Sequence, residues 1–225
     1  MALGGKHVVI TGASGGLGGA VLEAFLGAGA VCHLPRRGEA GPPRERVEAT
    51  GGVDLTDEGS VSRYYAGLPP LWASIHLTGG FAMSPVLETS LAQLEEQWEV
   101  NLVTAFLCCR EAARALVKAG AGGRLVNVAS RAGLVPSGGS VPYSVSKAAV
   151  CMLTQALAKE LEGQDILVNA VAPSIIDTPA NRASMPKANH ATWPKAAELA
   201  QAILWLASDQ NRLTSGTILP VYGRA

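Results

Sequence analysis

The sequence lacks three features: an excess of charge of either sign, a long hydrophobic run and a large number of cysteines. Lysine and arginine together number 18, as do aspartate and glutamate, and no basic block stands out. This balance gives no indication of a nucleic-acid or anionic membrane partner. No window reaches about 18 uninterrupted apolar residues, so we expect no transmembrane helix. The first apolar run, Val8–Ile10, is also too short for the core of a signal peptide.

The cysteines show none of the spacings that indicate a metal site or a redox pair. There are four of them, Cys32, Cys108, Cys109 and Cys151, all in apolar surroundings. Buried, reduced thiols are typical of proteins in a reducing compartment. We therefore expect no metal centre and a cytoplasmic location.

Short apolar runs alternate with longer helical patterns along the chain. With 225 residues, of which 48% are hydrophobic, residues 1–225 fit one α/β domain with a large core. The alternation predicts a parallel sheet covered by helices on both faces. The apolar runs predict strands at His7–Thr11, Val31–Leu34, Val53, Trp72–Leu77, Arg124–Ala129, Ile166–Ala172 and Thr217–Pro220. Helical periodicity predicts helices over residues 17–28, 57–67, 89–119, 143–162 and 196–207.

Two stretches, Arg36–Gly52 and Ser174–Pro194, are rich in proline, glycine or small polar residues and resist regular structure. The first is interpreted as a solvated connection beyond Arg37. The second follows a strand at the carboxyl edge of the sheet, where ligands bind in such folds, so we expect a substrate lid at about 174–195. Met185 and Trp193 weakly favour an apolar ligand there.

A glycine-rich turn joins the first predicted strand to the first predicted helix. It reads Thr11-Gly12-Ala13-Ser14-Gly15-Gly16-Leu17-Gly18. Glycines let a pyrophosphate approach the backbone, and the helix N-terminus presents free N–H groups to it. No Gly-Lys-Ser/Thr follows, which excludes a P-loop. The alternative is that these glycines serve only close packing.

The end of the second predicted strand bears on which dinucleotide is bound. Arg36 and Arg37 stand there and no acidic residue does. An acid at this place would bond the adenosine ribose, whereas arginine matches a 2′-phosphate, with Ser14 as a further donor. The sequence therefore favours NADP(H) over NAD(H). The alternative is that both arginines are only solvated.

Tyr143 and Lys147 open a helical stretch four residues apart, so they share one helix face. A nearby ammonium stabilises a phenolate, which suits a tyrosine that must both give and take a proton. Chance can supply such a pair. The alternative is an ordinary tyrosine at a helix start with a solvated lysine one turn on.

Taken together, these motifs resemble the short-chain dehydrogenase/reductase family over essentially the whole chain. The glycine turn matches TGxxxGxG, and Tyr143 and Lys147 match YxxxK. Further matches, in order, are Asp54, Asn101, Ser130 thirteen residues before Tyr143, and Asn169-Ala170-Val171-Ala172-Pro173 followed by Thr178. The resemblance implies a doubly wound Rossmann fold with a seven-stranded parallel sheet in the order 3-2-1-4-5-6-7.

The resemblance also implies a role for each matching residue. Tyr143 would exchange a proton with the substrate oxygen, Ser130 would hold that oxygen, Lys147 would bind the nicotinamide ribose and lower the pKa of the tyrosine, and Asn101 would support a water-mediated proton relay. The hydride would move between nicotinamide C4 and the carbonyl carbon. The dinucleotide would contact Gly12, Ser14, Gly16, Leu17, Gly18, Arg36, Arg37, Asp54, Leu55, Thr78, Gly79, Tyr143, Lys147, Pro173, Ile176 and Thr178.

The implied function is reversible, NADP(H)-dependent interconversion of a ketone and a secondary alcohol on a small molecule. The alternatives are an NAD-linked alcohol dehydrogenase and a catalytically silent dinucleotide-binding regulatory protein. A homo-oligomer, tetramer or dimer, is implied, and the small residues of helices 89–119 and 143–162 would suit its interface. The alternative is that those small faces pack on the sheet.

The sequence departs from the family pattern at the fourth predicted strand. His76-Leu77-Thr78-Gly79 stands where the family has Asn-Asn-Ala-Gly. We expect His76 to hydrogen-bond neighbouring backbone and to have no catalytic role. Asp54, Ser130 and Asn101 also have plain structural interpretations, as a helix cap, a turn cap and a buried amide bonded to backbone.

Overall fold

A single seven-stranded sheet runs through the computed structural model, which describes residues 2–224. Its order is β3-β2-β1-β4-β5-β6-β7, and every neighbouring pair is parallel. The strands are β1 (His7–Thr11), β2 (Val31–Pro35), β3 (Val47–Thr50), β4 (Ala73–His76), β5 (Gly123–Val128), β6 (Ile166–Pro173) and β7 (Ile218–Val221). The predicted doubly wound Rossmann fold is confirmed.

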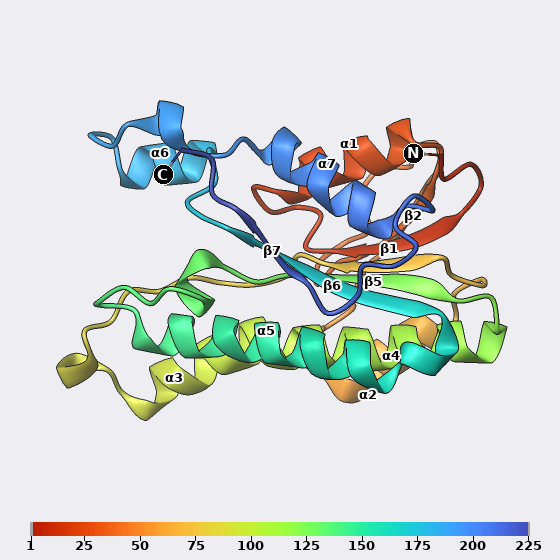
Figure 1. Ribbon diagram of the computed structural model, residues 1–225, viewed down its shortest axis with the longest axis horizontal. Helices are drawn as coiled ribbons and strands as arrows, with labels where there is room; N and C mark the ends of the chain where they lie inside the picture. The colour runs from red at the N-terminus through yellow and green to blue at the C-terminus, as the bar shows by residue number, and fades with distance from the viewer. Residues whose placement is uncertain (1, 225) are drawn as a thin grey trace.

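Helices cover both faces of the sheet (Figure 1). Those on one face are α1 (Gly18–Gly27) and α7 (Ala196–Ala207), and those on the other are α2 (Glu58–Ala66), α4 (Thr104–Ala119) and α5 (Val141–Glu160). Two further helices, α3 (Leu91–Trp98) and α6 (Pro179–Ser184), lie near the end of the sheet where the strands terminate. Over residues 2–224, no helix is long and apolar enough to cross a membrane.

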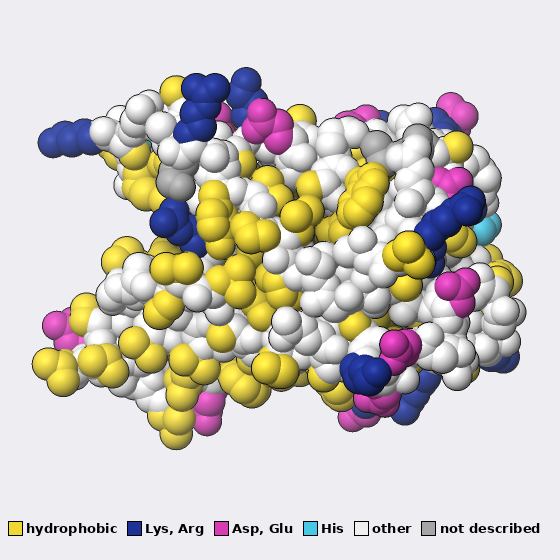
Figure 2. All heavy atoms as spheres, viewed as in Figure 1, with side chains coloured by type: hydrophobic (Ala, Val, Ile, Leu, Met, Phe, Trp, Pro, Cys, Tyr) yellow, Lys and Arg dark blue, Asp and Glu magenta, His cyan; other side chains and the backbone are white. Residues whose placement is uncertain are grey.

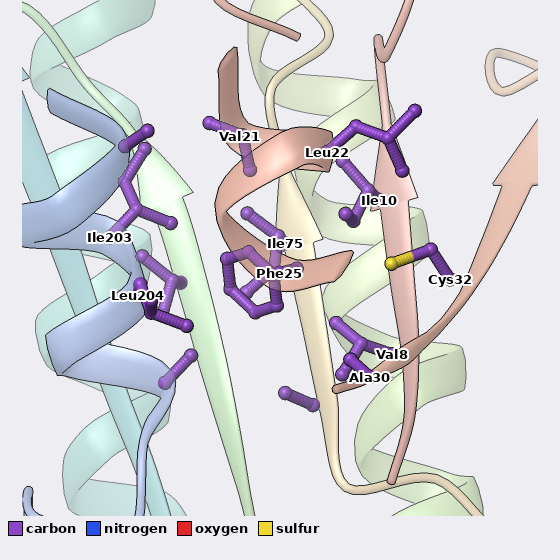
Figure 3. Close-up of a cluster of buried hydrophobic side chains, with 14 of the residues drawn as sticks. Val8, Ile10, Val21, Leu22, Phe25, Ala30, Cys32, Ile75, Ile203 and Leu204 are labelled. Atoms are coloured by element: carbon purple, nitrogen blue, oxygen red, sulfur yellow. The ribbon is translucent and has the colours of Figure 1, made fainter. Parts of the chain in front are cut away.

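The core between the sheet and the helices α1 and α7 is formed by alternate strand residues and one stripe of each helix (Figure 3). Val21 and Phe25, one turn apart on α1, point down onto Ile10 and Ile75 of the sheet. Phe25 is fully buried, and burial of a side chain of this size contributes about 2–3 kcal/mol. This packing fixes α1 behind the glycine turn that precedes it.

The structure corrects three boundaries. The third strand is Val47–Thr50 and not Val53, so it lies inside the stretch expected to be irregular. The second irregular stretch likewise contains α6. The helix expected over 89–119 is divided into α3, a π-helical turn at Glu99–Val103, and α4.

Parallel pairing brings the carboxyl ends of the central strands to one edge. Thr11 of β1 is in register with His76 of β4, and His76 with Asn127 of β5. Asn127 is in turn in register with Ala170 of β6. The residues that follow each of these strands therefore meet at that edge, where ligands bind in open α/β sheets.

Candidate active site

Helix α5 carries Tyr143 and Lys147 at the carboxyl edge of the sheet. The helix begins at Val141, two residues before the predicted start, because Pro142 occupies its first turn, where a missing N–H costs nothing. The Lys147 ammonium is buried and donates a hydrogen bond to the Val128 carbonyl at 2.9 Å. Burial lowers the pKa of Lys147 to about 8.

The side chain of Ser130, which follows β5, lies beside the Tyr143 hydroxyl. The Ser130 hydroxyl oxygen accepts a hydrogen bond from the Ala132 N–H at 3.2 Å. Burial raises the pKa of Tyr143, and the polar side chain of Ser130 opposes that rise. The structure thus brings the predicted serine and tyrosine into contact, whereas the lysine bonds a backbone carbonyl.

Asn101 lies in the π-helical turn Glu99–Val103 and is buried. Its amide nitrogen donates to the carbonyls of Gly80 and Gln97, both at 3.0 Å, and to the Ser146 hydroxyl at 3.2 Å. Its oxygen accepts from the Gly80 N–H at 3.1 Å. π-Turns are frequent at functional sites. Sequence analysis missed the anchoring residues Ser146 and Gln97, because no spacing pattern points to them.

Gly79 lies between Asn101 and Lys147. A Cβ atom at this position would lie 2.7 Å from the Asn101 Oδ1 atom and 3.1 Å from the Lys147 Nζ atom. No side chain fits there without displacing both groups. The side chains of Asn101 and Lys147 therefore both approach the backbone of Gly79, which is exposed and open to a ligand.

The glycine turn approaches two other segments that were predicted to bind the dinucleotide. Gly12 has a φ of +66°, and a Cβ on it would lie 2.8 Å from the Thr78 nitrogen. A Cβ on Gly16 would lie 2.9 Å from the Thr178 methyl group, and one on Gly18 would lie 2.4 Å from the Gly12 oxygen. Glycine at these positions keeps the backbone open to a phosphate. The turn therefore fits a dinucleotide.

Most of the remaining cofactor candidates have side chains that pack into the protein. Leu17 is buried in the core beneath α1, so only its backbone can face a ligand. Leu55 and Ile176 are partly buried and pack against the hydrophobic cores on the two faces of the sheet. Ser14 is exposed in the turn, and Pro173 is buried at the end of β6. The Thr178 hydroxyl oxygen caps α6 by accepting from the Asn181 N–H at 3.2 Å.

Arg36 and Arg37 follow β2, and Arg37 lies beside Asp54. The Arg37 guanidinium, which is 85% exposed, reaches the Asp54 carboxylate at 3.4 Å. Hydrogen bonds from the backbone and hydroxyl of Thr56 hold the pKa of Asp54 below its usual value. Asp57, and not Asp54, caps α2. The Arg36 Nε atom is buried without a hydrogen-bond partner, a donor that an anionic group of a ligand would satisfy.

His76, which replaces an asparagine of the family pattern, bonds side chains and not the neighbouring backbone as expected. Its Nε2 atom lies 2.9 Å from the Ser74 hydroxyl, and its Nδ1 atom lies 2.8 Å from the Asn127 Oδ1 atom. Asn127 donates onward to the Thr154 hydroxyl of α5 at 3.0 Å. Burial lowers the pKa of His76 to about 4, so the imidazole is neutral at physiological pH. The network ties β4 and β5 to α5.

Comparison with known proteins identifies the family. The short chain dehydrogenase family model matches residues 6–189. The chain belongs to the short-chain dehydrogenase/reductase family. Proteins of this family bind a nicotinamide dinucleotide and act as oxidoreductases on alcohols or ketones. The chain is therefore an oxidoreductase of that class.

Several individual proteins are similar over most of their length. The 3beta-hydroxysteroid dehydrogenase 1 of Eggerthella lenta is 32% identical over 244 residues, which cover 97% of this chain and 93% of that protein. The sorbitol dehydrogenase of Cereibacter sphaeroides is 31% identical over 190 residues, or 79% and 73% of the two chains. A solved structure of a putative gluconate dehydrogenase from Agrobacterium tumefaciens superposes with a TM-score of 0.88 at 26% identity, covering 99% and 96%.

Proposed function

We propose that the chain is an NADP(H)-dependent oxidoreductase that interconverts a ketone and a secondary alcohol with Ser130, Tyr143, Lys147 and Asn101. The approach of the Ser130 side chain to the Tyr143 hydroxyl, one helical turn from the buried Lys147 amine, carries the proposal. The bound dinucleotide would supply or accept the hydride. The protein would supply orientation and proton transfer.

Tyr143 is the proton donor when a ketone is reduced and the acceptor when an alcohol is oxidised. Ser130 holds the substrate oxygen beside the tyrosine hydroxyl. Lys147 supplies the positive charge that stabilises the phenolate and bonds the ribose, and the Val128 carbonyl positions its amine. The charge matters because burial alone raises the pKa of Tyr143, which makes the unassisted hydroxyl a poor base.

Two neighbouring segments support smaller proposals. Residues 174–195 form the lid, in which Trp193 is buried against His190 with ring centroids 4.6 Å apart.

We also propose a homo-oligomer. The small residues of α4 and α5, such as Ala112 and Ala158, are buried within the protein, so an interface would use their outward residues Phe106 and Met152, which are 43% and 64% exposed. The four cysteines are free and buried, which favours a cytoplasmic location.

The activity is tested with a panel of ketones, aldehydes and quinones and with NADPH or NADH. We expect oxidation of NADPH, followed at 340 nm, with at least one ketone. Tight dinucleotide binding without turnover on any compound would instead favour the regulatory binding protein. Faster turnover with NADH at equal concentrations would favour the NAD-linked dehydrogenase.

The choice between the two dinucleotides is tested at Arg36. We expect Arg36→Asp to raise the Kd for NADPH about tenfold or more, since a charge-assisted hydrogen bond contributes about 1.5–3 kcal/mol. The Kd for NADH should stay within about threefold, because NADH has no 2′-phosphate. Titration calorimetry measures both values. Arg212→Asp, the same charge change in the connection before β7, is the matched control. An unchanged Kd for NADPH in Arg36→Asp would contradict the assignment.

A further inference from the structure

Two loops beside Tyr143 are apolar and carry no charge. Residues 80–87 follow β4, and residues 132–142 precede Tyr143 on α5; neither stretch contains Asp, Glu, Lys or Arg. Seven large apolar side chains in these loops are at least 40% exposed, and four of them are Phe81 by 62%, Met83 by 69%, Leu134 by 40% and Val135 by 56%. We call these four residues the apolar rim. Clustered exposed apolar side chains mark binding surfaces in soluble proteins.

The rim is joined to the reacting tyrosine by direct contacts. The Phe81 ring meets the Tyr143 ring edge to face, with centroids 4.9 Å apart and an interplanar angle of 89°. The Ser84 N–H donates to the Gly139 carbonyl at 2.8 Å, which ties the two loops together. The Met83 methyl group lies 3.3 Å from where a Cβ on Gly139 would stand. The first loop therefore carries its apolar side chains onto the second, next to the tyrosine.

The two buried hydroxyl groups of these loops, those of Ser84 and Ser140, have partners within the protein. The Ser84 hydroxyl is buried and bonds the Thr89 hydroxyl at 2.7 Å. The Ser140 hydroxyl is buried against that of Ser144 at 3.4 Å. A ligand with several hydroxyl groups would find few partners here, and each desolvated hydroxyl without a partner lowers its affinity.

Two nearby cations, Arg131 and Arg182, contact other residues of the protein. The Arg131 guanidinium lies over the Tyr222 ring, 5.1 Å from its centroid. Arg182 of α6 bonds both carboxylate oxygens of Asp177, at 2.5 and 2.8 Å. Figure 2 shows a hollow at the left-hand end of the molecule, below α6, with hydrophobic side chains on both sides of its mouth and basic groups at its inner end. An anionic substrate would have to displace these contacts, whereas an apolar one would not.

We propose that the substrate is an uncharged ketone or secondary alcohol on an apolar ring skeleton, and that Phe81 and Met83 determine this specificity. The inference rests on the proposed function, in which Tyr143 exchanges a proton with the substrate oxygen. A ring laid on Phe81 buries apolar surface on both partners. Its oxygen then lies beside the tyrosine hydroxyl, and the rest of the ring needs no polar partner.

The test compares three ketones: 2-decalone, which is apolar and bicyclic; dihydroxyacetone, which is rich in hydroxyl groups; and acetoacetate, which is anionic. Binding is measured by saturation-transfer NMR in the presence of NADP⁺, and turnover by NADPH oxidation. We expect kcat/KM for 2-decalone to exceed that for the other two by at least about tenfold. Phe81→Ala and Met83→Ala should each raise KM for 2-decalone about tenfold and change kcat little. Leu213→Ala, at an apolar side chain 93% exposed near the amino end of the sheet, is the control.

The outcomes separate this inference from the proposed function. Binding of 2-decalone that depends on Phe81, without turnover of any ketone, would support the apolar substrate and overturn the proposed activity. Turnover of dihydroxyacetone or acetoacetate, with 2-decalone neither bound nor reduced, would overturn the inference and leave the activity standing. Variants that change only the sedimentation coefficient would show that a second copy of the chain covers the rim, and would also overturn it. Absence of both binding and turnover would overturn both.

Discussion

Tyr143→Phe is expected to lower kcat by about a thousandfold, within the range of about 10²–10⁴ for loss of a general acid–base group. The change removes only the hydroxyl beside Ser130 and leaves the ring that contacts Phe81. Dinucleotide affinity should therefore stay within about threefold, since most of the cofactor contacts lie elsewhere. Single-turnover rates with NADPH measure the first effect, and fluorescence titration of NADPH measures the second.

Tyr64→Phe is the matched control for this substitution. The Tyr64 hydroxyl on α2 is buried, but no hydrogen-bond partner among residues 2–224 satisfies it. Its removal should leave kcat unchanged and should not destabilise the fold, because a buried polar group without a partner carries a desolvation cost. If Tyr143→Phe retained more than a tenth of the wild-type kcat, Tyr143 would not be the proton donor.

The relation between Tyr143 and Lys147 could be predicted because it is local. Helical spacing alone puts both on one face of α5. The bond that the Lys147 ammonium makes, to the Val128 carbonyl, depends on how α5 packs against β5 and has no signal in the sequence. The predicted lowering of the tyrosine pKa by this lysine stays a prediction, because in the structure burial raises the pKa of Tyr143.

The edge of the sheet was harder to predict than its centre. Central strands such as β4 are buried on every residue, so they appear as continuous apolar runs. The edge strand β3 pairs only with β2, and its residues alternate between half-buried and exposed. The polar residues Glu48 and Thr50 interrupt its apolar pattern, so the sequence does not predict a strand there. The apolar residue Val53 was predicted as the strand instead, and its N–H donates to the Arg36 carbonyl beyond β3.

Contacts between distant segments account for the other differences. The π-helical turn at Asn101 inserts one residue into a helix without altering the apolar pattern enough to be seen. The replacement at His76 is visible in the sequence, but its partners Ser74 and Asn127 become neighbours only once β4 and β5 pair. Phe81 was missed as a candidate site residue because its contact with Tyr143 spans two loops.

Lys147→Met should abolish turnover and yet stabilise the fold at neutral pH. The Lys147 amine is buried, and desolvation lowers its pKa from 10.5 in the unfolded chain to about 8 in the folded protein. Protonation is thus penalised in the folded state. The penalty is full below pH 8, declines as the pH rises from 8 towards 10.5, and is absent above that. Its size is about 3 kcal/mol, at 1.36 kcal/mol for each unit of pKa.

The net gain in stability of Lys147→Met is smaller than this penalty, because methionine leaves the Val128 carbonyl without its donor. That loss costs about 1–2 kcal/mol. We therefore expect the free energy of unfolding of Lys147→Met to exceed that of the wild type by about 1–2 kcal/mol at pH 7. The difference should shrink or reverse by about pH 10. Urea denaturation at the two pH values measures it.

Lys159→Met, on the exposed side of the same helix and paired with Glu162, is the control and should show little change at either pH. A variant less stable than the wild type at pH 7, or a difference independent of pH, would mean that the ammonium is stabilised in the folded protein. The structure predicts the opposite: the charge that the reaction needs is held at a cost in stability.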